Sequence, residues 1–134
     1  MATYLLTWNP SCWDISSMAD ELHATGQRED LWTTQSRKIR AGDTLLFLRQ
    51  GVEPRGIVGL ATATSAPVQH GRRWYAPLRW HWLEPEDPVI SVADLQRDVP
   101  TGHWVPRCSG TRVSDIEAEV VLSLLDELRA EAHR

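Results

Sequence analysis

The middle of the chain, residues 44–83, constrains the fold most strongly, because it holds three strand-like segments separated by short loops. Residues 44–48 are strongly apolar, and residues 56–65 alternate small and β-branched side chains. Residues 74–83 carry large apolar side chains in phase on one face, namely Trp74, Leu78, Trp80 and Trp82. A hairpin-like loop at residues 51–55 joins the first two segments, so the pattern predicts an antiparallel sheet.

The flanking segments complete the expected architecture. A strand is predicted at Thr3–Trp8 and a short helix at residues 16–25, which Gly26 ends. Residues 31–40 are expected to form a polar connection, and residues 66–73 a loop. The order strand, helix, several strands and helix predicts an α+β fold, with a mainly antiparallel sheet that is small enough to curl into a barrel with flanking helices. At 134 residues, the chain is expected to form a single domain, residues 1–134.

Two capping signals predict further helices. Ser91 and Asp94 resemble a capping box that opens a short helix, and Ser114 with Glu117 forms a clearer one. The helix after Ser114 repeats apolar side chains at helical spacing, so we expect one buried face made of Ile116, Val120, Val121, Leu124, Leu125 and Leu128.

The charge is divided unevenly along the chain. The last 22 residues, 113–134, account for the whole net charge of −4. Residues 36–79 instead hold eight cationic side chains against two acids, and Lys38 is the only lysine of the protein. Arginine suits planar, bidentate contacts with phosphate, although a genome rich in G and C also favours arginine over lysine. We therefore expect contacts with a nucleic-acid backbone from Ser36, Arg37, Lys38, Arg49, Gln50, Arg55, Arg72 and Arg73.

Several classes of protein are not expected from this sequence. It has no apolar run of membrane-spanning length, and no basic segment precedes its first apolar run, so neither a transmembrane helix nor a secretory signal is expected. Two cysteines are too few for a disulfide scaffold, which favours a cytoplasmic protein with reduced thiols. The five histidines lack metal-ligand spacing, and no glycine-rich phosphate loop is present. We therefore expect a binding module rather than an enzyme, without a metal or another cofactor.

Seven tryptophans stand against one phenylalanine, which favours a recognition role for some of them. Trp32 lies in a polar segment without apolar rhythm, so a functional role is favoured there. Trp8 alternates with apolar neighbours, and a core position is as well supported as a pocket position. At least two of the tryptophans in residues 74–83 are expected in the core.

Four blocks of sequence, in order, resemble the EVE domains of the PUA-like superfamily, in the subgroup found alone or fused to HNH nucleases. They are Tyr4–Pro10, Leu31–Thr33 with Arg37–Ile39, Gly42–Val58 and Trp104–Gly110. The chain departs from the family pattern at Thr33 and Gln35, where Ser and Gly are expected, and at Arg107-Cys108, where a Gln-Ser type pair is expected. EVE domains are similar to YTH domains, which hold methylated adenine in RNA, and several relatives read modified cytosine in DNA.

The resemblance implies that a modified base, flipped from the duplex, enters an aromatic cage. Trp32 would form one wall and the strand of residues 75–82 a second, Asn9 would bond the base edge, and Trp8 and Trp13 would flank the entrance. Thr33 would contact the ring, and Ser109 and Gly110 would close the floor. The whole implied pocket is Trp8, Asn9, Trp13, Trp32, Thr33, Tyr75, Leu78, Trp80, Trp82, Ser109 and Gly110. A buried amide such as Asn9 or Gln50 can also read a Watson–Crick edge.

The function expected first is non-catalytic binding of DNA that contains 5-methylcytosine or a related modified cytosine. Two alternatives stay open: a reader of RNA on the same fold, with tRNA or methylated adenine as its target, and the specificity subunit of a modification-dependent nuclease. DNA is favoured over RNA as the partner, and a separately encoded nuclease is a further candidate partner. No membrane partner is expected.

Overall fold

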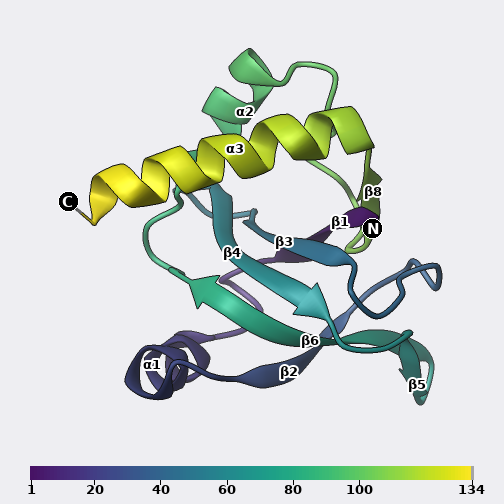
Figure 1. Ribbon diagram of the computed structural model, residues 1–134. Helices are drawn as coiled ribbons and strands as arrows, with labels where there is room; N and C mark the ends of the chain where they lie inside the picture. The colour runs from purple at the N-terminus through teal and green to yellow at the C-terminus, as the bar shows by residue number, and fades with distance from the viewer. Residues whose placement is uncertain (134) are drawn as a thin grey trace.

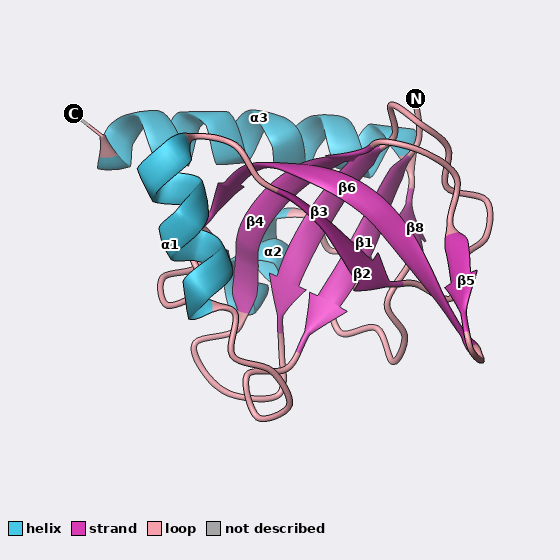
Figure 2. Ribbon diagram, turned by 90° about the horizontal axis from the view of Figure 1, so that it is seen from below, coloured by secondary structure: helices cyan, strands magenta, loops and turns pink. Residues whose placement is uncertain are grey.

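The computed structural model describes residues 1–133 and is a curled sheet flanked by helices (Figures 1 and 2). The elements in chain order are β1 (Thr3–Trp8), α1 (Ser16–Thr25), β2 (Glu29–Thr33), β3 (Thr44–Arg49), β4 (Gly56–Ala63), β5 (Val68–His70), β6 (Arg73–Leu83), β7 (Ile90–Ser91), α2 (Val92–Asp98), β8 (Thr111–Val113) and α3 (Asp115–Ala132). This α+β arrangement confirms the predicted fold class.

The sheet has the strand order β2-β6-β4-β3-β1-β8, with β5 paired to β6 and β7 paired to β4. Every described pair is antiparallel except β1 with β3, which run parallel because α1 and β2 intervene between them in sequence. The edge strands β2 and β8 are not paired with each other in the described ladders, so the sheet curls without closing into a barrel (Figure 2). We call the gap between these two edges the seam.

Figure 1 shows α2 and α3 on one side of the sheet and α1 on the other. Each face of the sheet carries its own core. One core packs alternate residues of β1, β3 and β6 against α1, and Phe47 lies in it between Trp32 and Trp80 at ring-centroid distances of 4.8 and 4.9 Å. The other core packs the opposite face against α2 and α3. Because both faces are covered, the central strands β3 and β4 are buried along most of their length, as the continuous apolar runs predict.

A bulge in β6 corrects the predicted phase of its tryptophans. Trp80 faces Ala61 of β4 and Trp82 faces the adjacent Leu60, so His81 is an extra residue in the ladder. The extra residue turns Trp82 to the α3 side, whereas Trp80 stays on the α1 side. The expectation of a single in-phase row was therefore wrong at Trp82.

The helix boundaries follow the predicted caps. Ser91 Oγ accepts from the Asp94 backbone N–H at 3.0 Å, and Ser114 and Glu117 form the full capping box. The predicted buried face of α3 is partly wrong, because Ile116 and Val120 are 78% and 42% exposed. The buried stripe of α3 is Ala118, Val121 and Leu125.

Four short strands were not predicted, among them the two-residue β7. The expected polar connection contains the end of β2, and the expected loop at residues 66–73 contains β5. β8 follows a loop and pairs with the edge of β1. None of the described helices is long and apolar enough to cross a membrane.

Candidate functional site

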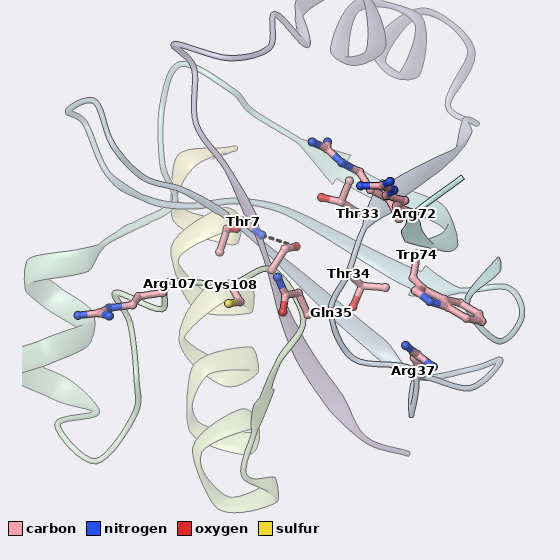
Figure 3. A pocket seen from close by; sticks show the side chains of 11 residues that line it. Thr7, Thr33, Thr34, Gln35, Arg37, Arg72, Trp74, Arg107 and Cys108 are labelled. Carbon is pink, nitrogen blue, oxygen red and sulfur yellow. Dashed lines mark hydrogen bonds between the residues drawn. The ribbon is translucent and has the colours of Figure 1, made fainter. Parts of the chain in front are cut away.

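A pocket of about 560 Å³ opens at the seam, between the end of β1, the end of β2, the start of β6 and the loop before β8 (Figure 3). Its size is within the usual range for sites that hold a small molecule or a single base. The lining residues are Thr7, Thr33, Thr34, Gln35, Arg37, Arg72, Arg73, Trp74, Arg107, Cys108 and Ser109.

Hydrogen bonds around this pocket join the two sides of the seam and tie the loop before β8 to β1. The Gln35 backbone N–H donates to the Ser109 carbonyl at 2.8 Å, and the Thr7 N–H donates to Ser109 Oγ at 3.1 Å. Gly110 passes close to Thr34, with φ of 101°, and a Cβ at Gly110 would collide with Thr34 Oγ1. The backbone that frames the pocket is therefore held in place by both edges of the sheet, and glycine is required at Gly110.

The electrostatics of the pocket oppose the net charge of the protein. Its lining includes four arginines and no aspartate or glutamate, whereas the protein carries a net charge of −4. No ion pair within residues 1–133 joins any of these four guanidinium groups to a carboxylate. Four cations without such partners make an anion-attracting site. We call these residues, Arg37, Arg72, Arg73 and Arg107, the seam arginines.

Trp74 is the aromatic side chain of the pocket lining. It has the same phase as Ala76, Leu78 and Trp80 of β6, but it lies at the start of the strand, where the core has ended. The ring is half-buried, and the Arg37 guanidinium lies 4.7 Å from its centroid. Trp74 therefore offers a flat stacking surface at the pocket.

The structure brings part of the predicted set to this pocket. Thr33, Ser109, Arg37, Arg72 and Arg73 line it, as expected of a single site. A neighbouring hollow of about 630 Å³ shares Gln35 and Arg37 with the pocket and is otherwise lined by Tyr4, Ser36, Lys38, Gly110 and Arg112. Ser36, Lys38 and Gly110 are therefore close to the pocket without lining it.

Other predicted pocket residues belong to the core. Trp8, Leu78, Trp80 and Trp82 are 4%, 1%, 3% and 9% exposed. Two of the indole groups donate hydrogen bonds inside the protein: Trp80 Nε1 to Asp30 Oδ2 at 2.8 Å, and Trp8 Nε1 to the Trp13 carbonyl at 2.8 Å. These four residues stabilise the fold and are not pocket walls. The strand pattern does not show that helices cover both faces of the sheet, and these helices bury the four side chains.

Trp32 and Tyr75 lie next to the pocket without lining it. Trp32 is half-buried against the core, and its Nε1 donates to the Thr7 carbonyl at 2.9 Å across the seam. It therefore supports the wall that Thr7 and Thr33 form. Tyr75 points to the opposite face of β6 from Trp74 and contacts the ring of His70.

The turn after β1 is a local structure. Asn9 Oδ1 accepts from the Ser11 N–H at 2.9 Å, and the amide lies against Gly51. In this structure the Asn9 side chain therefore caps its own turn, as asparagine often does. Trp13 is 62% exposed on the same turn and is not part of the pocket lining. Gln50 Nε2 donates to the Pro106 carbonyl at 3.3 Å, and the buried Gln50 Oε1 accepts no hydrogen bond within the described residues.

Arg49 and Arg55 do not join the seam arginines. Arg49 is only 6% exposed, and its guanidinium donates to the carbonyls of Val52, Glu53 and Pro85. Arg55 bonds the Glu53 carboxylate at 2.7 Å, and this contact holds the pKa of that carboxyl below its usual range. The Arg49 side chain is therefore engaged inside the fold and away from the pocket, which does not support the expected contact with a nucleic-acid backbone.

Sequence reasoning missed the residues that complete the pocket, namely Thr7, Thr34, Gln35, Trp74, Arg107 and Cys108. The sequence could have indicated Trp74: it lies at the end of a strand, in phase with core residues, and such a side chain can extend beyond the core. No group of three or more metal-ligating side chains occurs among residues 1–133.

No protein-family model matches the chain, and comparison with curated proteins gave no match. Solved structures resemble it over nearly its whole length. A hypothetical protein from Leishmania major aligns with a TM-score of 0.67 at 18% identity, over 96% of this chain and 97% of that one. A protein from Pseudomonas syringae aligns with a TM-score of 0.61 at 14% identity, over 92% and 99%.

Human THYN1, solved in complex with DNA that contains 5-methylcytosine, aligns with a TM-score of 0.57 at 14% identity, over 93% of this chain and 98% of that one. These likenesses show that the chain shares the α+β fold of these structures. The finer resemblance to EVE domains stays a prediction.

Proposed function

We propose that this protein is a non-catalytic reader of modified DNA that holds a flipped base, 5-methylcytosine or a related modified cytosine, in the seam pocket. The observation that carries the proposal is the pocket lining, which combines a half-buried tryptophan with four arginines and no acidic side chain. A nucleotide combines a flat aromatic ring with an anionic phosphate, so this lining suits a nucleotide. The DNA that THYN1 binds in its own structure supports the choice of DNA.

The energetics of base flipping are compatible with this site. Extruding a base costs a few kcal/mol of lost stacking and pairing, which the protein must offset. Stacking on Trp74 can contribute about 1–3 kcal/mol. Phosphate contacts from the seam arginines add affinity that depends on salt and not on sequence.

The polar lining would read the base edge. Gln35 supplies both a donor and an acceptor, and the hydroxyls of Thr33, Thr34 and Ser109 can do either. These groups take the place of the wider aromatic cage expected from sequence, because Trp74 is the aromatic residue in the lining. The proposed recognition is therefore one stacking surface with a polar rim.

We also propose that a separately encoded nuclease is the partner to test. A protein that binds a modified base but does not cut DNA can direct cleavage to that base if it brings a nuclease to the same place. Recovery of such a nuclease in a pull-down with wild-type protein, both with and without modified DNA, would support this step, and Trp74→Ala should remove only the recovery that depends on DNA. Absence of a nuclease from both pull-downs would contradict it.

The function is tested by fluorescence anisotropy with short labelled duplexes that each carry one modified or plain cytosine. Single-stranded RNA of matching length and an RNA with methylated adenine serve as competitors. We expect the duplex with 5-methylcytosine to bind most tightly, and Arg72→Ala to weaken binding, with Arg97→Ala of α2 as the control. Tighter binding of either RNA would favour the RNA-reader alternative, and absence of binding to every probe would contradict nucleic-acid recognition at this site.

A further inference from the structure

Arg37 covers the stacking surface of the pocket. Its guanidinium lies 4.7 Å from the Trp74 ring centroid, and both side chains line the same cavity. Figure 3 shows the two side chains next to each other at one end of the pocket. A planar guanidinium over an indole occupies the place that a stacked base would take.

The backbone that carries Arg37 is held beside Trp74. The Thr34 N–H donates to the Trp74 carbonyl at 2.9 Å, and the Ser36 N–H donates to Thr34 Oγ1 at 3.1 Å. On the other side, Arg40 donates to the Arg37 carbonyl at 2.9 Å. The main chain of Arg37 is thus bonded on both sides.

The guanidinium of Arg37 is much less constrained. The Arg37 side chain is exposed. Within residues 1–133 its guanidinium makes neither a hydrogen bond nor an ion pair, and it contacts the Trp74 ring. An exposed cation–π contact is weaker than stacking of a base on an aromatic ring. A base can therefore displace this head group while the backbone stays in place.

We propose that Arg37 is an exchangeable placeholder: it covers Trp74 in the empty pocket, and when a base takes the ring it swings to the phosphate of the bound nucleotide. The inference rests on the proposed function and adds a second role to a residue expected only to contact phosphate. Arg37 suits both roles because its flat guanidinium stacks on aromatic rings and also bonds phosphate in a bidentate manner.

This exchange predicts opposite effects of one substitution on two ligands. Arg37→Ala removes the competitor for the Trp74 face, so the free nucleoside 5-methyl-2′-deoxycytidine should bind about two- to five-fold more tightly, the worth of an exposed cation–π contact. The same substitution removes a phosphate contact, so a single-stranded oligonucleotide with one 5-methylcytosine should bind several-fold more weakly, with a shallower salt dependence. A residue with only a phosphate role produces the second effect alone.

The experiment titrates both ligands into wild type, Arg37→Ala, Arg72→Ala, Trp74→Ala and Arg97→Ala, followed by ligand-observed NMR for the nucleoside and anisotropy for the oligonucleotide. Arg97→Ala, an exposed arginine of α2 outside the pocket, is the control, and both ligands should bind it as they bind wild type. Arg72→Ala removes a seam arginine that has no described contact with the Trp74 ring, so it should weaken oligonucleotide binding and give no gain in nucleoside binding. Trp74→Ala should lower the affinity for both ligands, and adding Arg37→Ala to it should give no gain for the nucleoside.

The outcomes separate the two claims. Tighter nucleoside binding with weaker oligonucleotide binding in Arg37→Ala supports the exchange. If Arg37→Ala leaves nucleoside affinity unchanged or lowers it, while wild type binds both ligands, the placeholder role is wrong and the proposed function stands. If wild type binds neither ligand, the proposed function fails, and the placeholder role fails with it.

Discussion

Arg49 and three of the four seam arginines lie in the same basic segment, residues 36–79. The fold nevertheless places Arg49 and the seam arginines in opposite environments. Arg49 is buried at the end of β3 and donates to three backbone carbonyls. The seam arginines are exposed around a pocket and have no carboxylate partner among the described residues. The difference teaches that the acceptors around an arginine, and not its place in a cationic stretch, decide whether it is available to a ligand.

The largest effect is expected from Arg49→Ala, on stability and not on binding. The substitution leaves three carbonyls of the β3–β4 loop and its neighbourhood without their donor, so the free energy of unfolding should fall by about 2–4 kcal/mol. Urea unfolding of the variant measures this change. Below the unfolding transition its DNA affinity should depend on salt as in wild type, and a shallower dependence would place Arg49 at the nucleic acid after all.

The next effect is expected from Trp74→Ala, on binding and not on stability. Loss of the stacking surface should weaken binding of modified DNA by about 1–3 kcal/mol. The free energy of unfolding should change little, because the ring lies beyond the core. Anisotropy and urea unfolding measure the two quantities, and Trp74→Phe, which keeps a stacking ring, should recover most of the affinity. An unfolding loss as large as that of Arg49→Ala would make Trp74 a core residue.

A smaller effect is expected when one seam arginine is removed. Arg72→Ala or Arg73→Ala should weaken binding of modified and plain DNA alike, and each should reduce the slope of log affinity against log salt by about one. The matched control is Arg97→Ala, an exposed arginine of α2 that pairs with Asp94 and Asp98. A seam variant that changes the preference for modified over plain DNA, with an unchanged slope, would show contact with the base instead of the backbone.

The smallest effect is expected from the methyl group itself. Burying one extra carbon contributes roughly 0.8 kcal/mol, which corresponds to about a four-fold preference for 5-methylcytosine over cytosine. Competition between two otherwise identical duplexes measures it. Thousand-fold discrimination would require a different recognition than a single stacking surface with a polar rim.

Much of the fold was predictable because its signals are local. Thr3–Trp8 and Ser16–Thr25 begin and end where the apolar pattern and Gly26 place them, and the Ser114 capping box starts α3. β2 was not predictable, since polar and apolar side chains do not alternate along its sequence, and its strand conformation comes from pairing with β6. The bulge at His81 was hidden for a similar reason, because it is a property of the β4–β6 ladder.

The site was predictable only in part, because the seam joins residues that are distant in sequence. Thr33 and Ser109 were expected together and do line one pocket. Trp80 was expected beside them and is in the core, since both faces of β6 are covered at that point. Trp74 lies on the same face six residues earlier, where β6 passes the end of the core and reaches the pocket.

The comparison of Trp74 with Trp80 gives the most direct test of the central claim, that a base stacks at the seam. The seven tryptophan indole N–H signals are recorded by NMR during titration with a duplex that carries one 5-methylcytosine, and Trp74→Phe and Trp80→Phe assign the two signals. We expect the Trp74 signal to shift strongly on binding, and the Trp80 signal, whose indole bonds Asp30 inside the fold, to stay nearly unchanged. Binding that leaves the Trp74 signal in place would contradict the account.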